Sequence, residues 1–374
     1  MEKYLGERIP KLGFGLMRLP KLADGQIDVE QVKGMVDTFM DAGFRYFDTA
    51  YGYDGGNSEK AAKAALVDRY PRDSFYLATK LPAWTADSKE AAQQMFYTSL
   101  ARTGAGYFDF YLLHNLGTGR TEKFDEYGIW DFLAERKKEG LIKHLGFSMH
   151  AEAEDLDKVL TAHPEAEFVQ LQINYADWED EKVQSRACYE VCKKHGKPVI
   201  IMEPVKGGSL SNLPEAATVA MRQIAPEASN ASWALRFAAS LDGLVTVLSG
   251  MSTPEQMADN IRTMQDFKPL TDAERAALDE TVAYLRSVPT IPCTSCNYCT
   301  KGCPQQIKIP GVFSCVNTVK VYQNLAGARG SYGFVIREGG RASDCIACGQ
   351  CEAVCPQSIH IIDELKAAAE LLDK

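Results

Sequence analysis

Two copies of one cysteine ladder constrain the fold of this chain more than any other sequence feature. Each copy follows C-x-x-C-x-x-C-x-x-x-C-P. The first holds Cys293, Cys296, Cys299 and Cys303, and the second holds Cys345, Cys348, Cys351 and Cys355. A cubane iron–sulfur cluster needs one thiolate on each of four irons. One tight loop supplies three thiolates, and the cysteine before proline ligates the other cluster. We therefore predict two [4Fe-4S] clusters, one bound by Cys293, Cys296, Cys299 and Cys355, the other by Cys345, Cys348, Cys351 and Cys303.

The alternatives for these cysteines are zinc sites and disulfides. Zinc prefers paired C-x-x-C hooks without the trailing C-P, and disulfides are unexpected in a chain without a secretion signal. The other three cysteines, Cys188, Cys192 and Cys315, have apolar neighbours or no partner in the sequence and are interpreted as core residues. The ladders are thus better explained by clusters than by either alternative.

Charge and composition exclude several classes of function. The net charge of −9 argues against a nucleic-acid-binding surface. No basic run suggests a membrane surface, and no apolar window reaches the length of a transmembrane helix or a signal peptide. From the charge and the apolar windows we expect no nucleic-acid or membrane partner. Because clusters of this kind are sensitive to oxygen, we expect a cytoplasmic protein from an anaerobe.

Eight short apolar runs alternate with amphipathic stretches of helical period in the first 290 or so residues. This alternation predicts an α/β fold, a (β/α)₈ TIM barrel, over residues 1–288. Residues 289–374 are predicted to form a mainly α-helical, ferredoxin-like two-cluster domain. Between the ladders we expect a helix over Gly311–Leu325 and a mobile, glycine-rich loop over Gly327–Gly340. The expected strands are Lys11–Leu16, Phe44–Asp48, Phe75–Lys80, Phe108–His114, His144–Ser148, Phe168–Asn174, Pro198–Glu203 and Leu244–Gly250.

Four reactive side chains lie at or just after consecutive expected strand ends, which form the catalytic face of such barrels. Asp48, Lys80 and His114 close three strands, and Tyr53 follows Asp48 in a loop. A free tyrosine, with a pKa of about 10, donates a proton poorly unless a nearby cation stabilises its anion. We expect Lys80 to lower the pKa of Tyr53 and Asp48 to hold Lys80. His114 would orient a carbonyl oxygen, and Tyr53 would act as general acid or base.

The residues around these four positions resemble the aldo-keto reductase family. The segment GFRYFDTAYGYDGGNSE is similar to the family signature, and ATK at Ala78–Lys80 and YLLHN at Tyr111–Asn115 are similar to its lysine and histidine elements. The similarity covers about the first 285 residues. Together with the ladders, the chain most resembles the ferredoxin-fused, iron–sulfur branch of this family. The resemblance implies hydride exchange between a nicotinamide and a small carbonyl or alcohol substrate.

The same resemblance implies residues that bind the nicotinamide end of NADH or NADPH. Ser148 and Gln172 match the family's carboxamide contacts, whereas Met149 stands where an asparagine is common. His150 is expected to replace that contact. Met202 occupies the position of a stacking tyrosine and can cover the ring with its thioether. A core role for Met202 is the alternative.

The loop SGMSTPEQMADN resembles the family's adenosine clamp. Asp259 and Asn260 match its adenine contacts, whereas Gly250, Met251 and Gln256 stand where a lysine, a serine and an arginine often hold a 2′-phosphate. Because two cations are missing, we expect NADH to be preferred over NADPH.

Other positions are assigned to the nucleotide and the substrate. Pro204 and Lys206 follow the seventh expected strand, and Lys206 is expected to lie over the pyrophosphate. The residues expected to line the substrate pocket are Tyr51, Trp84, Leu116 and Trp178; ordinary burial in loops is the alternative.

The two regions carry different redox chemistry, because nicotinamide moves a hydride and cubane clusters move single electrons. A flavin normally joins the two, and the sequence has no flavin motif. The clusters can serve a flavin or flavoprotein partner, act as a structural clasp or redox sensor, or supply electrons to a barrel that holds a flavin or drives a radical reduction. Our leading prediction is a nicotinamide-dependent carbonyl reductase or alcohol dehydrogenase with two clusters. The alternative is an electron-transfer or redox-sensing subunit whose barrel turns over no substrate alone.

Overall fold

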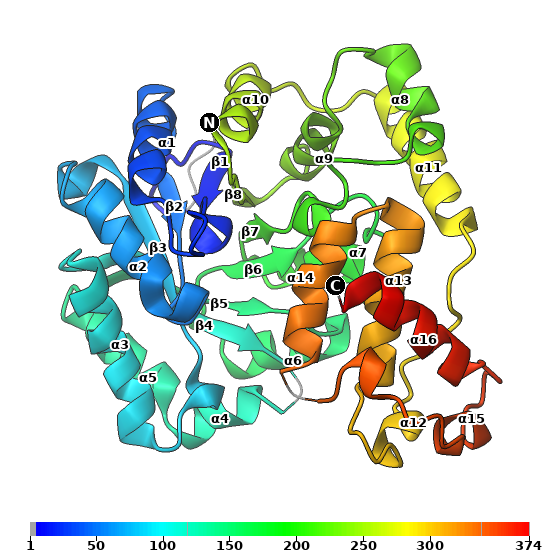
Figure 1. Cartoon of the computed structure of the whole chain (residues 1–374). Helices are drawn as coiled ribbons and strands as arrows, with labels where there is room; N and C mark the ends of the chain where they lie inside the picture. Colours follow the sequence, from blue (N-terminus) through cyan, green and yellow to red (C-terminus); the bar gives the residue numbers. More distant parts are fainter. Residues whose placement is uncertain (1–4, 118, 338, 374) are drawn as a thin grey trace. The chain divides into compact units, whose positions relative to one another are not determined.

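Eight parallel strands close into a barrel, as the sequence predicts. A computed structural model describes residues 5–117, 119–337 and 339–373. Each strand pairs with the next along the chain, and β8 pairs with β1 (Figure 1). The strands are β1 Leu12–Gly15, β2 Tyr46–Asp48, β3 Tyr76–Leu81, β4 Phe108–Leu116, β5 Ile142–Met149, β6 Val169–Gln172, β7 Val199–Met202 and β8 Leu244–Ser249.

Apolar side chains fill the inside of the barrel, because strands of a closed parallel sheet are buried on both faces. Tyr46, Phe110 and Phe168 belong to this buried cluster and expose at most a trace of their surface. At Gly13 an added Cβ would lie 2.7 Å from Leu248 Cδ2, so a larger residue there would force the Leu248 side chain to move. The packed interior leaves the strand ends as the places where polar side chains can gather.

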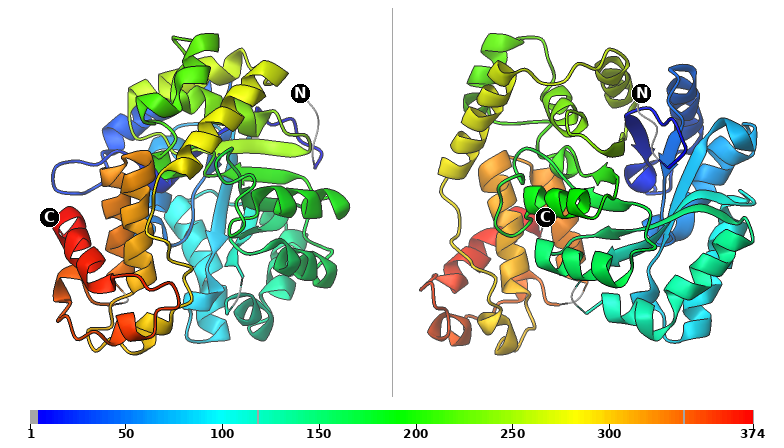
Figure 2. Two further views of the ribbon diagram at one scale, coloured as in Figure 1. Left: turned by 90° about the vertical axis from the view of Figure 1, so that its right-hand side faces the viewer. Right: turned by 180° about the vertical axis from the view of Figure 1, so that it is seen from behind.

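Helices surround the strands, and several begin at side-chain caps that the sequence supplies (Figure 2). Asp28, Ser88 and Thr253 each accept a hydrogen bond from a backbone N–H of the first helical turn, which stabilises the helix start. The helices are α1 Val29–Asp41, α2 Asn57–Ala62, α3 Lys89–Thr103, α4 Thr121–Glu126, α5 Ile129–Lys138, α6 Ala153–Ala162, α7 Ser185–Lys194, α9 Asn230–Ala239 and α10 Pro254–Gln265. Among the described residues no helix combines the length and the apolarity needed to cross a membrane.

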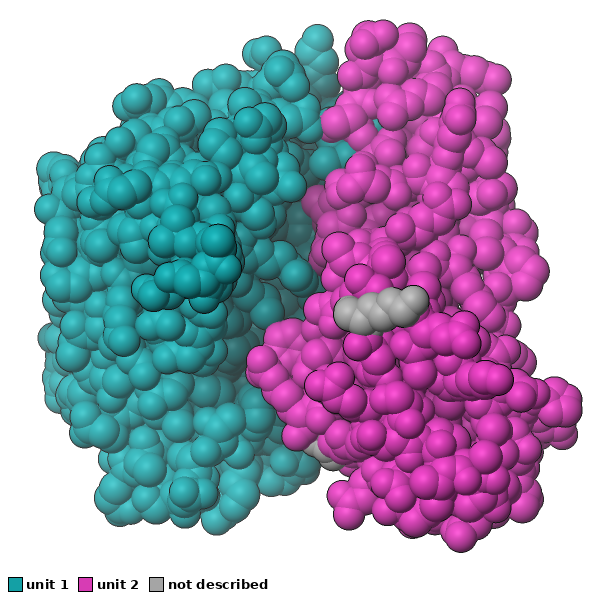
Figure 3. Space-filling model, in the orientation of Figure 1, with its two compact units in different colours: residues 1–204, 231–270 teal, residues 205–230, 271–374 magenta. Residues whose placement is uncertain are grey.

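The chain divides into two compact units (Figure 3). The first contains the described residues up to Pro204 together with Ala231–Leu270, and therefore all eight strands. The second contains Val205–Asn230 and the described residues from Thr271 on. A domain boundary between residues 288 and 289 stays a prediction.

The second unit is helical, and its parts are joined by side-chain hydrogen bonds. Thr281 of α11 donates to the carbonyl of Ala217 at 2.8 Å, and Asn324 donates to Ser209 at 3.1 Å. These bonds attach the segment after β7 to the C-terminal helices. The helices are α8 Val219–Ile224, α11 Asp272–Ser287, α12 Tyr298–Lys301, α13 Ile309–Tyr322, α14 Leu325–Val335, α15 Gln350–Ala353 and α16 Ile361–Leu372.

The expected mobile loop over Gly327–Gly340 is wrong for most of its length, because Leu325–Val335 forms helix α14. The side chain of Asn324 caps this helix by accepting from the N–H of Gly327 at 2.9 Å. Tyr332 packs into the core of the unit, where it is 3 % exposed. Tertiary packing and a cap thus outweigh the low helix propensity of glycine.

Candidate functional site

Three of the four predicted catalytic residues meet around one buried ammonium group. The Nζ of Lys80 in β3 lies 2.5 Å from Oδ1 of Asp48 at the end of β2 and 3.4 Å from the Tyr53 hydroxyl. It also donates to the carbonyl of Thr49 at 2.7 Å. Lys80 and Asp48 are almost completely buried. The pairing of β2 with β3 brings the three residues together, because parallel strands end at the same edge of the sheet.

The loop that carries Tyr53 is held by buried polar residues that our sequence reasoning missed. Glu59 is fully buried and accepts from the Thr79 hydroxyl at 2.8 Å and from Arg102 at 3.2 Å. Arg102 also donates to the carbonyl of Tyr51 at 2.9 Å. Glu59 belongs to the NSE triplet that ends the quoted signature segment, so its place in that motif was the available signal. These bonds fix the path of the chain on both sides of Tyr53.

The pKa of Tyr53 differs from the sequence-based expectation. Burial raises this pKa, and although the Lys80 cation acts in the opposite direction it does not reverse the shift. The negative charge of Asp48 raises the pKa of Tyr53 further, and its ion pair with Lys80 weakens the effect of Lys80 on Tyr53. Lys80 therefore lowers the pKa of Tyr53 as expected, but burial outweighs it, so the net pKa is raised and the phenol stays protonated at neutral pH. For Lys80, burial alone would lower the pKa, but Asp48 and Tyr53 outweigh it and raise that pKa.

His114 lies beside Tyr53 as a neutral imidazole. The centroids of the two rings are 5.9 Å apart in an edge-to-face arrangement. Burial lowers the pKa of His114 to about 3, with the charges of Lys80, His150 and Arg120 adding to the effect. Its Nδ1 is buried and makes no hydrogen bond to a described residue. A neutral imidazole can donate one hydrogen bond without adding a charge to the site.

The residues assigned to the carboxamide lie at the ends of β5 and β6 and form one hydrogen-bonded set. Ser148 accepts from the backbone N–H of Asn115 at 2.8 Å. Gln172 pairs its Oε1 with His150 Nδ1 at 3.2 Å and donates from Nε2 to Asp177 at 2.9 Å. Asp177 is buried and was not predicted from the sequence. It fixes the amide of Gln172 so that the oxygen faces His150.

The remaining nucleotide residues of the first unit lie after β7 and β8. Met202 ends β7, and its sulfur accepts from Gln170 at 3.5 Å, whereas Pro204 is buried just beyond. Gln256 at the start of α10 accepts from the N–H of Ser252 at 2.7 Å. This bond ties the loop after β8 to the helix.

Three further residues assigned to the nucleotide differ in their exposure and in their partners. Asn260 is buried and donates to Ser249 at 2.9 Å, whereas Asp259 forms an ion pair with Arg262 at 2.7 Å, and Gly250 is exposed. Lys206 belongs to the second unit, where its Nζ lies 5.9 Å from the centroid of the Tyr322 ring. Its contact with a pyrophosphate stays a prediction.

The four residues assigned to the substrate have different degrees of exposure. Trp84 is 38 % exposed and donates from its indole N–H to the carbonyl of His114 at 3.1 Å, which holds it close to β4. Tyr51 is half-buried under the guanidinium of Arg102. Leu116 is fully buried, and Trp178 packs against other aromatic rings. A substrate-lining role for these residues stays a prediction.

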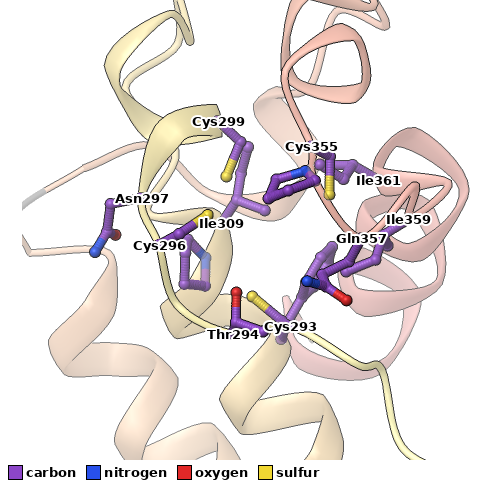
Figure 4. Close-up of a pocket in the computed structure, with 13 residues that line it drawn as sticks. Cys293, Thr294, Cys296, Asn297, Cys299, Ile309, Cys355, Gln357, Ile359 and Ile361 are labelled. Atoms are coloured by element: carbon purple, nitrogen blue, oxygen red, sulfur yellow. The ribbon is translucent and has the colours of Figure 1, made fainter.

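Two pockets in the second unit gather the ladder cysteines in the predicted exchanged sets. Four thiols face the space of the first pocket, three from the first ladder and Cys355 from the second (Figure 4). The second pocket has three thiols from the second ladder and Cys303 from the first. Each pocket has about 330 Å³ of empty volume, part of it open to solvent. All eleven cysteines of the chain are free thiols, so the disulfide alternative does not apply.

The lining of the pockets suits an iron–sulfur cluster. Apolar side chains such as Phe313, Ile309 and Leu365 surround the thiols, and an apolar shell limits the access of water to a cluster. Burial raises the pKa of Cys351 to about 11, so this thiol would need the charge of a metal to lose its proton. Four thiols that line one pocket match the ligand set of a four-iron cluster, in which each thiolate would bind a different iron.

Comparison with family models agrees with both regions. The model of the aldo/keto reductase family matches residues 11–283, which is well over half of the chain. The chain belongs to the aldo/keto reductase family. A second model, the 4Fe-4S dicluster domain, matches residues 292–360 and covers both ladders. This member of the family is therefore an oxidoreductase whose sequence carries a 4Fe-4S dicluster domain after the barrel.

Curated relatives match the reductase region to different extents. An aldo-keto reductase of Mycolicibacterium vanbaalenii is 27% identical over 274 residues, which are 72% of this chain and 88% of that protein. An aldo-keto reductase of Mycolicibacterium smegmatis and the methylglyoxal reductase DkgA of Yersinia pestis are each 31% identical. These two alignments cover 41% and 38% of this chain. The chain spans about half the length of these two relatives, 49% and 46%.

Solved structures agree on the fold. The aldo-keto reductase AKR11C1 of Bacillus halodurans, in its holo form, superposes with a TM-score of 0.60 at 23% identity. An aldo-keto reductase of Klebsiella pneumoniae in complex with NADPH gives a TM-score of 0.60 at 21% identity. Both alignments cover 75% of this chain and 95% of the other protein. At this identity the likeness supports the barrel fold and no more.

Proposed function

We propose that this protein reduces a small carbonyl compound, or oxidises the matching alcohol, with a nicotinamide nucleotide as hydride donor or acceptor. In this proposal Tyr53 is the general acid of reduction and the general base of oxidation. Lys80 and Asp48 act on Tyr53, and His114 orients the substrate oxygen. The observation that carries the proposal is the buried Lys80 ammonium, bonded to Asp48 at 2.5 Å and to the Tyr53 hydroxyl at 3.4 Å.

The pKa shifts suit proton donation during reduction. Burial keeps Tyr53 protonated at neutral pH, so a proton is available to a carbonyl oxygen that gains negative charge. As the proton leaves, the phenolate forms next to Lys80, whose raised pKa keeps it a cation. Lys80 therefore stabilises the product of proton transfer more than the starting phenol, which is the requirement for catalysis.

His114 would donate a hydrogen bond from Nε2 to the same oxygen. Its low pKa means that it remains neutral at neutral pH, so it leaves the positive charge of the site to Lys80. A neutral donor polarises the carbonyl without repelling Lys80. This arrangement separates the two tasks, orientation at His114 and proton transfer at Tyr53.

Residues at the ends of β4, β5 and β6 fit a nicotinamide carboxamide. A bound nicotinamide would supply or accept the hydride, and its carboxamide offers both donors and an acceptor. Asn115 Oδ1 is buried without a hydrogen-bond partner among the described residues and could accept from the amide. Ser148, which accepts from the N–H of Asn115, keeps its own hydrogen for the amide oxygen. The family relative from Klebsiella pneumoniae was solved with NADPH, but we propose NADH as the preferred nucleotide because Gln256 is uncharged.

Steady-state kinetics tests this proposal directly. Anaerobically purified protein should oxidise NADH or NADPH in the presence of some members of a panel of aldehydes and ketones, and Tyr53→Phe should lower that turnover about a hundredfold or more. If Tyr53→Phe keeps the wild-type turnover, or if no carbonyl compound supports nucleotide oxidation, the proposed chemistry is wrong.

For the clusters we propose one-electron transfer to or from a protein partner. The pairing of two four-thiol pockets favours electron transfer, because a structural role would not require two clusters. A chain that serves only as an electron-transfer subunit would oxidise no nucleotide with carbonyl compounds until its partner is added. Iron, sulfide, flavin and nucleotide analysis of one anaerobic sample separates the cases. About eight irons without flavin supports a reductase with two clusters, whereas stoichiometric flavin favours a flavin-bearing barrel.

A further inference from the structure

Arg120, like Arg136, is a half-buried arginine of the barrel whose Nε donor is unsatisfied. Arg136 still donates from its other nitrogens to Tyr97 and Glu139. Arg72 pairs with Asp109 at 2.7 Å, and Arg102 pairs with Glu59 at 3.2 Å. The Nε of Arg120 is also buried, but it makes no hydrogen bond to a described residue. A buried donor without a partner lowers the free energy of unfolding, because it has lost its hydrogen bonds to water and gained none within the protein. A ligand with a hydrogen-bond acceptor would satisfy this donor.

The guanidinium of Arg120 is held near the end of β4, the strand that carries His114. The N–H of Arg120 donates to the carbonyl of Gly117 at 2.9 Å, which folds the segment back on itself. An added Cβ at Gly117 would lie 3.2 Å from Nη2 of Arg120, so glycine leaves the room that the guanidinium needs. The guanidinium carbon lies 6.0 Å from the centroid of Trp84, whose indole is bonded to the carbonyl of His114.

The charge of Arg120 acts on the proposed reaction centre from one side. It contributes to the low pKa of His114 and also lowers that of His150, after the larger effect of burial in each case. Glu203, just after β7, acts on Tyr53 and His150 with the opposite sign. An anion near His114 would therefore be attracted to the Arg120 side and repelled from the Glu203 side.

We propose that Arg120 forms a carboxylate-binding subsite beside His114, and that the substrate is a carbonyl compound that also bears a carboxylate, such as an oxo acid. This inference rests on the proposed carbonyl reduction at Tyr53 and adds the substrate class. The planar guanidinium can donate two parallel hydrogen bonds to a carboxylate, which would satisfy the buried Nε. Trp84, half-exposed next to it, offers an apolar face for the body of the substrate.

Aldehydes with and without a carboxylate test the subsite. We would measure kcat/KM of the full-length, cluster-loaded protein for benzaldehyde and for the three carboxybenzaldehyde isomers. The wild type should prefer at least one acid isomer over benzaldehyde. In Arg120→Met this preference should fall about ten- to hundredfold, and Arg120→Lys should retain part of it because it keeps the charge but not the fork. Lys123→Gln is the matched control, since Lys123 is an exposed cation of the same segment that already pairs with Glu126; its preference should stay at the wild-type value.

Binding of benzoate, measured by calorimetry, makes the test independent of turnover. If benzoate binds the wild type and binds Arg120→Met at least tenfold more weakly, the subsite stands even if neither aldehyde is reduced, and only the proposed reaction fails. If benzoate does not bind the wild type, or binds both proteins equally, the subsite is overturned. An acid preference that survives Arg120→Met also overturns it. Circular dichroism of each variant shows whether the fold is kept.

Discussion

The barrel and the dicluster domain of residues 292–360, called the module below, build their sites in different ways. In the barrel, paired strands bring Asp48 and Lys80 together, and protein atoms satisfy the buried ammonium. In the module, the thiols come from two four-residue helices, α12 and α15, and from the irregular segments around them, and each pocket draws thiols from both ladders. The residues of the reductase centre are therefore positioned by the paired strands of the barrel. The cysteines of each metal site come from two separate segments, which a bound cluster would join.

This difference predicts that the two sites can be damaged separately. A substitution at the proton-transfer site should leave the iron content unchanged, because no barrel strand supplies a ladder cysteine. A substitution at a ladder cysteine should remove iron from the module while the barrel keeps its fold.

The largest effect is expected for Tyr53→Phe. Removal of the hydroxyl takes away the general acid, which should lower carbonyl turnover about a hundred- to ten-thousandfold. Iron content and nucleotide affinity should match the wild type, because Tyr53 lies in the loop after β2, apart from both ladders in sequence. Parallel assays of kinetics, iron and nucleotide binding check this. A loss of iron together with activity would mean that the two sites are not separable.

Lys80→Met should have a smaller effect, about ten- to hundredfold on turnover. Because its loss leaves Asp48 buried and unpaired, the double variant Asp48→Asn/Lys80→Met keeps the site neutral and is the better protein to assay. Alcohol oxidation requires the deprotonated Tyr53, so its rate rises as pH approaches the pKa of Tyr53. Lys80 lowers that pKa, so its removal should move this rise to higher pH. An unchanged pH profile would mean that Lys80 does not act on the proton transfer at Tyr53.

Gln256→Arg should change nucleotide preference by about tenfold. A guanidinium at this position would pair with a 2′-phosphate, so the Kd for NADPH should fall while that for NADH stays close to the wild-type value. Fluorescence titration with both nucleotides measures the change. Tighter NADPH than NADH binding in the wild type would contradict the expected preference at the outset.

The smallest expected effect is a change of about twofold in iron content. Cys299→Ala should lower the iron content to about half, because one of the two four-iron sites loses a ligand. Cys315→Ala is the matched control, since both residues are buried in the same apolar core but only Cys299 lines a pocket. Equal iron loss in the two variants would mean that core packing, and not ligation, explains the effect.

The sequence predicts the barrel well because short apolar runs and strand-end polar residues follow from parallel β-structure. It predicts α14 poorly, since the burial of Tyr332 depends on contacts with distant residues such as Asp373, although the cap at Asn324 is local. The pKa of Tyr53 depends on the balance between burial and one charge, which no motif encodes. Arg120 has no motif either, because its importance lies in how its segment folds back beside Trp84.

The exchange of cysteines between the ladders has a consequence for how the protein is made. The ribosome synthesises every strand of the barrel before Cys293, so the reductase unit can fold while the rest of the chain is still emerging. The second pocket lacks its full set of thiols until Cys351 has been translated, and the first lacks its full set until Cys355 has been translated. Metal loading is therefore a late event in biogenesis, and nascent chains that stop between the ladders would carry a finished barrel but no complete iron site.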